Sequence, residues 1–406
     1  MNSRNSVAFL GFLLILSISG PLAINFYLAL LPNMATELGT SAAKIQQTVS
    51  VYLIGFAGAQ LIVGPLSDRF GRKPVLLVCY SIFVIASLAC ALATDAGLLI
   101  TARFVQSLGG CAGVLLSRVI VKDVYPPEEM GKVMSYMTTG FSMAPLLAPA
   151  IGGFIGVSFG WRSVFFVFVG FGILVIVWTI FGFKESNKHL NPEAMKIKRL
   201  FGNYLFLLKS DSFMLYLIVI CASVSGTLTY ASASSFILIE LLKTPAEYYG
   251  LLFSVSAFGM LLGSVLAAKL NSKIGSKSTI WYGVMILVCG GLSMAILSWL
   301  GVFSVMAIVG PMFLYAFGNG IIMPTAMSLA ISPFPKMAGS AAALIGCCQT
   351  ALGALCGYIV SLLYSNSATP MTSMIGFLSF LAFISVLSIR AKTKKTASLT
   401  SLKQSI

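Results

Sequence analysis

The sequence contains few charged residues. Only 9% of its 406 residues are Asp, Glu, Lys or Arg, whereas 58% are hydrophobic. Soluble globular domains carry about 25% charged residues, and the mean hydropathy here is +0.96. This composition excludes a soluble globular protein and indicates an integral membrane protein embedded in a lipid bilayer.

Residues that commonly carry out catalysis or bind metals are also scarce. There is one histidine, His189, and the cysteines show no C-x-x-C spacing. The apolar runs contain neither paired carboxylates nor metal-ligand spacing. These absences argue against an enzyme, and we expect neither a metal nor a cofactor.

Long apolar runs recur along the chain, and a helix needs about 20 apolar residues to cross a bilayer. Twelve such runs are separated by short polar, glycine-rich or charged segments. They cover residues 7–32, 44–66, 75–93, 97–121, 130–157, 161–183, 213–239, 247–269, 278–298, 302–328, 337–363 and 370–390. The sequence therefore predicts an all-α fold of twelve transmembrane helices, the first retained rather than cleaved as a signal peptide.

The two halves of the chain resemble each other. "LSDRFGRK" at 66–73 aligns with "LNSKIGSK" at 270–277, which keeps the glycine and two basic positions. Such duplication is typical of transporters, so we predict two pseudo-symmetric six-helix halves. The predicted units are the first half 1–183, a central loop 184–212, the second half 213–390 and a basic tail 391–406.

The net charge of +15 is distributed unevenly. Basic residues gather at the termini and in the even-to-odd connections, whereas the opposite connections hold only Lys44, Arg162 and Lys243. The positive-inside rule then places both termini in the cytoplasm. We expect a multi-pass protein of a cell membrane, the inner membrane in a bacterium. The basic residues lack aromatic interleaving, so they do not predict nucleic-acid binding.

The central loop contains a candidate helix. Asn191 and Pro192 have the residue types of an N-cap and a first helical position, and basic residues are mixed with apolar ones over 195–208. We predict a short helix lying on the inner leaflet. A plain solvated linker is the alternative.

One connection is unusually rich in charge. Residues 64–73, "GPLSDRFGRK", join the second and third spans. Small residues at two positions suit a tight turn, an aspartate can satisfy the N-terminal end of a helix, and an arginine can bridge to another carboxylate. Such contacts exist in only one conformation, so this is a candidate gate, with a solvated connector as the alternative. Its candidate residues are Gly64, Asp68, Arg69, Gly71, Arg72 and Lys73.

This connection closely resembles the signature loop of the major facilitator superfamily. Other stretches resemble its twelve-span drug:proton antiporter branch and, within it, the Bcr/CflA-like multidrug exporters. "RFVQSLGG" is similar to an Arg-x-x-Gln-Gly element, with Arg103, Gln106 and Gly109 matching. "APLLAPAIGG" is similar to the antiporter-type Pro/Gly element, which here consists of Pro145, Pro149, Gly152 and Gly153.

The resemblance implies a secondary active exporter of amphipathic organic compounds, acting in drug or multidrug efflux by alternating access with proton antiport. Its partners would be a small-molecule substrate and protons, and we expect a monomer. It also implies that Asp123 meets Arg72. Export or facilitated passage of an endogenous metabolite, such as a siderophore or an amino-acid derivative, is an alternative, and a non-transporting membrane sensor is a more distant one.

One departure from the family concerns proton coupling. Related exporters carry an aspartate in helix 1 shortly before a Leu-Pro, whereas "AINFYLALLP" has Asn25 there. Asparagine cannot exchange a proton. Glu240, at the outer end of the seventh span, is the remaining acid near a span, and we predict that it carries the proton. One alternative is that Glu240 is an interfacial acid paired with Lys243. The other is that transport is coupled to a different ion or to none.

Two arginines fall within the fourth span. A cation there costs about 2.5–3.5 kcal/mol on insertion scales, so Arg103 should face the interior of the bundle with Gln106 as its partner one turn away. Arg118 is nearer the cytoplasm and can snorkel towards it. Both are candidates for the transport cycle, and a purely structural role is the alternative.

In this fold, helices 1, 2, 4, 5, 7, 8, 10 and 11 line the cavity. A mixed set of aromatic, methionine and amide side chains suits amphipathic organic molecules, although packing is the alternative for each residue. A basic cavity without an acid favours neutral or anionic compounds. The candidate cavity residues are Asn25, Tyr27, Tyr52, Met143, Tyr230, Phe236, Asn319 and Gln349.

Overall fold

The protein is a bundle of long helices in a computed structural model that describes residues 7–187, 190, 192, 197–334, 337–364 and 366–404. Helices are the regular elements throughout this part of the chain. Eleven of them are long and apolar enough to cross a membrane, and the twelfth, α6, has a described apolar stretch at Met143–Phe159. The prediction of an all-α, twelve-span membrane protein is confirmed.

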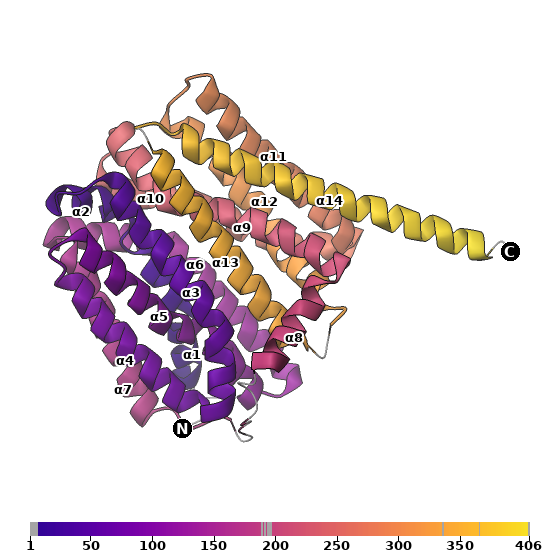
Figure 1. Cartoon of the computed structure of the whole chain (residues 1–406), viewed down its shortest axis with the longest axis horizontal. Helices are drawn as coiled ribbons and strands as arrows, with labels where there is room; N and C mark the ends of the chain where they lie inside the picture. The colour runs from indigo at the N-terminus through magenta and orange to yellow at the C-terminus, as the bar shows by residue number, and fades with distance from the viewer. Residues whose placement is uncertain are drawn as a thin grey trace.

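The helices form two groups that are consecutive in sequence (Figure 1). The first group consists of α1 (Val7–Asn25), η1 (Leu28–Leu30), α2 (Leu31–Glu37), α3 (Ala42–Phe70), α4 (Arg72–Ala91), α5 (Ala96–Val124), α6 (Pro127–Phe159) and α7 (Arg162–Phe181). The second consists of α9 (Asp211–Ser235), η2 (Phe236–Leu241), α10 (Ala246–Ile274), α11 (Ser276–Trp299), α12 (Val305–Ile331), α13 (Ala338–Leu363) and α14 (Thr369–Gln404). The groups meet chiefly where α3 packs on α13 and α6 packs on α10.

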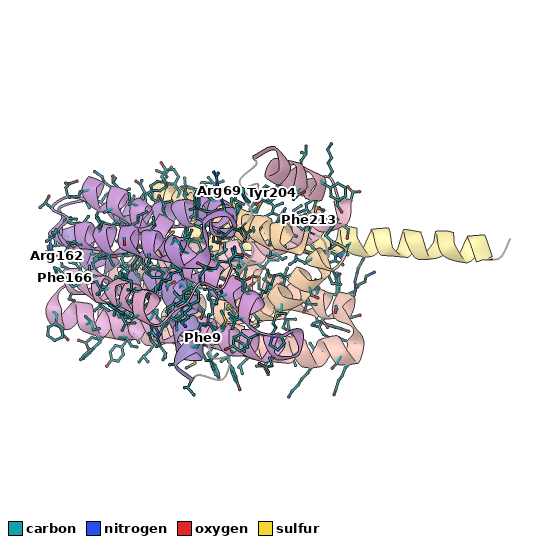
Figure 2. All side chains as sticks on the ribbon, turned by 90° about the horizontal axis from the view of Figure 1, so that it is seen from below. Phe9, Arg69, Arg162, Phe166, Tyr204 and Phe213 are labelled. Carbon is teal, nitrogen blue, oxygen red and sulfur yellow. The ribbon has the colours of Figure 1, made fainter. Side chains whose placement is uncertain are left out.

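An even number of crossings brings both ends of the chain to the same face, called here the terminal face. Figure 2 shows Arg162 at one end of the bundle, whereas Tyr204 and Phe213 lie towards the other end, from which α14 projects. The predicted basic tail continues the helix of the last span, since α14 runs without a break to Gln404.

The first span of each group is irregular. Pro21 lies inside α1, which ends at Asn25 and gives way to the short 3-10 helix η1 and then to α2. In the second group, α9 passes directly into the π-helix η2. Proline removes a backbone donor, and π-helical turns are uncommon outside functional sites. These irregular segments lie on the face opposite to the termini, where η1 contacts α9 and α10.

The aligned connections in the two groups have the same backbone geometry. Gly71 separates α3 from α4 with φ +98°, and Gly275 separates α10 from α11 with φ +79°. A side chain is strained at such angles, which explains why glycine recurs in the repeat. Gly64 does not form part of the turn. The expectation for Gly64 was wrong, because α3 continues as a helix for six residues beyond it.

The predicted helix of the central loop is present as α8 (Ile197–Leu208) and contacts α9 and α13. Leu207 is fully buried, and the ring of Phe206 meets that of Phe334 edge to face at 6.3 Å. The predicted N-cap Asn191 lies outside the described residues. Pro192 lies in a turn, and residues 193–196 between it and the described start of α8 lie outside the described residues, so its place at the start of the helix stays a prediction.

Candidate functional site

Arg72 is the centre of the charged connection between α3 and α4. Its side chain is almost fully buried, and its Nη1 donates to Asp68 Oδ1 at 2.5 Å and to Ser67 Oγ at 2.7 Å. Its Nε donates to Asp123 Oδ2 at 3.0 Å, which is the contact implied by the family resemblance. Two carboxylates compensate for burying one guanidinium, so the cluster joins α3, α4 and α5.

Glu185, which follows α7, was not recognised in the sequence. Its two carboxylate oxygens accept hydrogen bonds from the backbone N–H groups of Arg72 at 3.0 Å and Lys73 at 2.9 Å. These are free donors at the N-terminus of α4, where a negative charge is favourable. We expected Asp68 to serve a helix end, but at α4 this role belongs to Glu185. A Cβ atom at Gly71 would lie 2.6 Å from Glu185 Oε2, a second reason for glycine there.

Polar contacts also connect α7 to α4 near both ends of α7. On the terminal face, Lys73 Nζ donates to the carbonyl oxygen of Phe183 at 2.9 Å. On the opposite face, Arg162 Nη2 donates to the carbonyl oxygen of Ala93 at 3.2 Å and forms an ion pair with Glu37 of α2. These contacts hold the first group of helices together.

Arg103 of α5 is fully buried in an aromatic cage. Its guanidinium carbon lies 4.3 Å from the ring centroid of Tyr27 and 4.2 Å from that of Tyr52. It donates to Gln106 Oε1 at 2.5 Å and to the carbonyl oxygen of Ala23 at 3.0 Å. A third ring, that of Phe165, has its centroid 5.9 Å from the same carbon. The predicted interior position and the Gln106 partner are confirmed, and the ring contacts were not foreseen.

The aromatic cage offsets the cost of burying the Arg103 guanidinium in place of a carboxylate partner. Arg103 takes part in none of the salt bridges between described residues. Aromatic faces attract a cation by about 2 kcal/mol when it is desolvated. Gln106 in turn donates to Ser87 Oγ at 2.7 Å, and the Tyr27 hydroxyl lies 3.2 Å from Thr48 Oγ1. The guanidinium is thus fixed to α1, α3 and α4.

Asn25 stands at the break in the first span. It is buried, and its Nδ2 donates to the carbonyl oxygen of Pro21 at 2.7 Å, one turn back in α1. The Pro/Gly element of α6 packs against this break, since a Cβ atom on Gly152 would overlap the carbonyl oxygen of Phe26. One on Gly153 would lie 3.2 Å from the Cβ of Ala29.

Pro145 and Pro149 lie inside α6 before these glycines. Within the element, the close approach of α6 to the backbone of the break therefore occurs at Gly152.

Most of the predicted cavity residues are buried against other side chains in this conformation. Tyr230 stacks on Phe253 at 5.6 Å, Phe236 packs on Tyr364 at 6.1 Å, and Asn319 donates to Thr227 Oγ1 at 3.2 Å. Together with Tyr27 and Tyr52 of the cage, these side chains are buried. Gln349 is partly exposed.

Met143 is exposed on α6 and shares a helical face with exposed Leu147 and Phe154. Its assignment to the substrate cavity stays a prediction.

One face of α5 changes from buried to exposed along its length. Ser107 and Cys111 are fully buried, whereas Arg118 and Lys122, further along the same face, are exposed. The guanidinium of Arg118 lies 5.9 Å from the ring centroid of Phe141 on α6. This face of α5 is therefore buried around Cys111 and becomes exposed towards the terminal face.

The opposite face is closed by close contact between the groups. A Cβ atom on Gly250 of α10 would overlap the backbone of Ala150 on α6. One turn further, Ser254 Oγ donates to the carbonyl oxygen of Leu146 at 2.5 Å. The two groups of helices are thus in backbone contact on this face.

The closed side also contains a buried polar seam, formed by Gln46 and Ser50 of α3 with Ser232 and Ser235 of α9. A Cβ atom on Gly357 of α13 would lie 2.9 Å from Ser232 Oγ and 3.3 Å from Ser50 Oγ. In the described part of the chain, both amide atoms of Gln46 and the hydroxyls of Ser50 and Ser235 have no hydrogen-bond partner. Each such atom costs about 1–3 kcal/mol, so water entering an opened seam would relieve this cost.

Glu240 lies in the π-helix η2 on the same closed side and is partly exposed. Burial and the neighbouring Glu240 carboxylate raise the pKa of the Tyr364 hydroxyl. Among the described residues, the ion pairs within 4 Å do not include one between Glu240 and Lys243. The predicted proton carrier therefore has both the Tyr364 hydroxyl and the Lys243 ammonium as electrostatic neighbours, without a salt bridge to Lys243.

Comparison with known proteins agrees with this architecture. Residues 7–358 match the Major Facilitator Superfamily. The chain belongs to the Major Facilitator Superfamily. It is 30% identical to a bicyclomycin resistance protein homolog of Haemophilus influenzae over 378 residues, covering 91% of this chain and 93% of that protein. It is 29% identical to multidrug resistance protein D of Escherichia coli, covering 85% of this chain and 86% of the other.

The superfamily fold is also evident in solved structures. The xylose transporter XylE from E. coli, in a partially occluded inward-open conformation, superposes with a TM-score of 0.69 at 14% identity, covering 94% of this chain and 97% of that one. This chain is accordingly a multi-pass membrane protein of a transporter superfamily.

Proposed function

We propose that the protein is a secondary active exporter of amphipathic organic compounds, acting in drug or multidrug efflux. The observation that carries the proposal is the close contact between the two groups of helices on the face opposite to the termini, where Gly250 of α10 meets Ala150 of α6, while Arg118 and Lys122 of α5 are exposed towards the terminal face. Relatives named for bicyclomycin and multidrug resistance match most of the chain, which supports organic compounds as the cargo.

We propose that the protein lies in a bacterial inner membrane with both termini on the cytoplasmic side, because the terminal face carries most of the basic residues. In this orientation the two groups would part on the cytoplasmic side to receive substrate. Residues 1–183 and 213–390 would move as two units, while the central loop 184–212, with α8 on the inner leaflet, and the tail 391–406 remain on the cytoplasmic side.

Release requires the closed side to open. The buried polar seam supports this, because its unpartnered atoms gain water when α3 separates from α9 and α13. The cluster around Arg72 lies within the first unit, so it would keep α3, α4 and α5 together as that unit moves. Cage residues and the amides of Asn319 and Gln349 would contact substrate only when the units rearrange.

Proton coupling is proposed to use Glu240, since Asn25 donates within its own helix and cannot titrate. We expect Glu240→Gln to slow export driven by an imposed pH gradient while sparing downhill exchange. Asn25→Asp is expected to make transport more steeply pH-dependent. Reconstituted vesicles, with substrate and internal pH followed together, measure both effects.

The matched control for coupling is Glu247→Gln, which removes an exposed acid on the same face. If Glu240→Gln accumulated substrate as well as this control does, Glu240 would not be the carrier. If the unaltered protein moved no protons at all, coupling to protons would be rejected.

The proposed export itself is tested in an efflux-deficient bacterial host that expresses the chain. Accumulation of a panel of drugs and cell metabolites is compared with that in the empty host. Lower accumulation of several unrelated organic compounds is expected. Unchanged accumulation across the panel, with the protein present in the membrane, would reject the proposal.

A further inference from the structure

A groove of about 580 Å³ runs along the outer side of α7 towards the terminal face. It begins at Gly170 and ends at Gly182, and positions three or four residues apart, which share one face of a helix, form its walls. These lining residues are Ile173, Leu174, Val177, Trp178 and Phe181. None of the lining residues is ionisable, so the groove is apolar over its whole length.

The groove faces the lipid. Figure 1 shows α7 at the edge of the first group, and it packs chiefly on α4. Phe181 is 84% exposed, and a Cβ atom at Gly170 would meet nothing within 4 Å, so the deep end of the groove is open. The rise from residue 170 to residue 182 is about 18 Å, and the hydrocarbon of one leaflet is about 15 Å thick. The groove therefore has the length of one acyl chain.

Trp178 forms the fixed wall of the groove near the terminal face. Its ring packs on that of Phe12 of α1 at 5.7 Å. A Cβ atom at Gly182 would lie 2.5 Å from Trp178 Cδ1, so glycine lets the indole lie against the end of α7. Tryptophan is typical of the membrane–water interface. The groove thus ends at the depth where lipid headgroups begin.

Two lysines lie at this end of the groove. Lys73 Nζ donates to the carbonyl oxygens of Ile180 and Phe183, both at 2.9 Å, and so lies beside the last lining residues. An ammonium group has three N–H donors, so one N–H of Lys73 remains in the part of the chain that the structure describes. Lys184 is exposed two residues beyond the groove.

The neighbouring acid is already engaged in hydrogen bonds to the backbone. Glu185 accepts from the N–H groups of Arg72, Lys73 and Asn187. Two lysines and one glutamate leave one positive charge at this end of the groove. An anionic group attached to an acyl chain in the groove complements that charge.

We infer that the groove binds an anionic phospholipid from the leaflet on the side of the terminal face. One acyl chain lies along α7, and the phosphate accepts a charge-assisted hydrogen bond from the remaining N–H of Lys73. A choline or ethanolamine headgroup brings its own cation to this positive end, which disfavours zwitterionic lipids. Lipid binding at this position does not require the proposed export.

Quenching of Trp178 fluorescence by brominated lipids tests the inference. The full-length protein is reconstituted in phosphatidylcholine mixed with phosphatidylglycerol or phosphatidylcholine that carries dibrominated chains. Bromine quenches tryptophan on contact, and subtracting the fluorescence of Trp178→Phe isolates the signal of Trp178. We expect brominated phosphatidylglycerol to bind about fivefold better than brominated phosphatidylcholine, as one lysine near an anionic surface implies.

Lys73→Gln is expected to lower this preference to less than about twofold. The matched control is Lys277→Gln, because Lys277 is exposed at the equivalent position of the repeated connection and should leave the preference unchanged. Equal binding of the two lipids to the unaltered protein, or a preference unchanged in Lys73→Gln, would overturn the inference.

Gly170→Leu separates the groove from the charge and does not depend on the folding of the Lys73 variant. It fills the open deep end while keeping Lys73, and it should abolish the preference. Gly58→Leu in α3 is its control, since Gly58 is also an exposed helical glycine with nothing within 4 Å of an added Cβ atom. A preference that survives in Gly170→Leu would show that surface charge alone attracts the lipid, and the groove would be rejected as its site.

Discussion

Arg103→Ala is expected to abolish export and to destabilise the protein by about 3–5 kcal/mol. The substitution empties the space between the rings of Tyr27 and Tyr52 and leaves Gln106 Oε1 and the carbonyl oxygen of Ala23 without their donor. Thermal unfolding of the purified protein and drug accumulation in the efflux-deficient host measure the two effects.

Arg390→Ala is the matched control for Arg103. Arg390 is also stacked on an aromatic ring, that of Trp281 at 3.7 Å, but it is exposed. Its removal should cost about 0.5–1 kcal/mol, as for exposed cation–π pairs, and should leave export intact. Arg103→Lys separates charge from geometry, because lysine keeps the charge without the planar fork. Full activity of Arg103→Ala would show that the cage is dispensable.

Gly152→Ala is expected to have the second large effect, a loss of export with a destabilisation of at least about 1–3 kcal/mol. The added methyl group would overlap the carbonyl oxygen of Phe26, where the first span is broken. Backbone cannot rotate out of the way as a flexible side chain can, so α6 and the break must separate. Thermal unfolding and accumulation assays again provide the measurement.

Two other glycines calibrate this result. Gly153→Ala brings its methyl group to 3.2 Å from Ala29 Cβ and should cost less. Gly170→Ala in α7 meets nothing within 4 Å and should be neutral or slightly stabilising. Activity of Gly152→Ala equal to that of Gly170→Ala would contradict the proposed close packing.

The local sequence pattern was sufficient to predict the membrane-spanning helices and the turn that recurs in the two halves. Apolar runs of the required length predicted twelve helices, and the alignment of the two connections predicted that Gly71 and Gly275 occupy equivalent positions. The Arg103–Gln106 contact was also predictable, because residues three apart share a helical face. Gly64 was assigned to the turn because the motif was interpreted as one unit, although α3 remains helical through it.

Contacts between distant segments were not predictable from local pattern. Glu185 caps a helix that begins more than a hundred residues earlier, and its place after the sixth span resembles that of any loop acid. The polar and aromatic contacts around Arg103 connect α5 to α1, α3 and α4. Met143 illustrates the remaining difficulty, since composition identified a plausible cavity residue but not the face of α6 on which it lies.

The attachment of α7 to α4 near both ends provides a fixed reference within a moving molecule. Lys73 binds the end of α7 at Phe183, and Arg162 binds the end of α4 at Ala93, so neither helix can slide along the other without breaking polar contacts. Spectroscopic labels placed on this pair will keep a constant separation throughout the cycle. Distances measured from either helix to α10 or α13 can therefore be interpreted as motion between the halves.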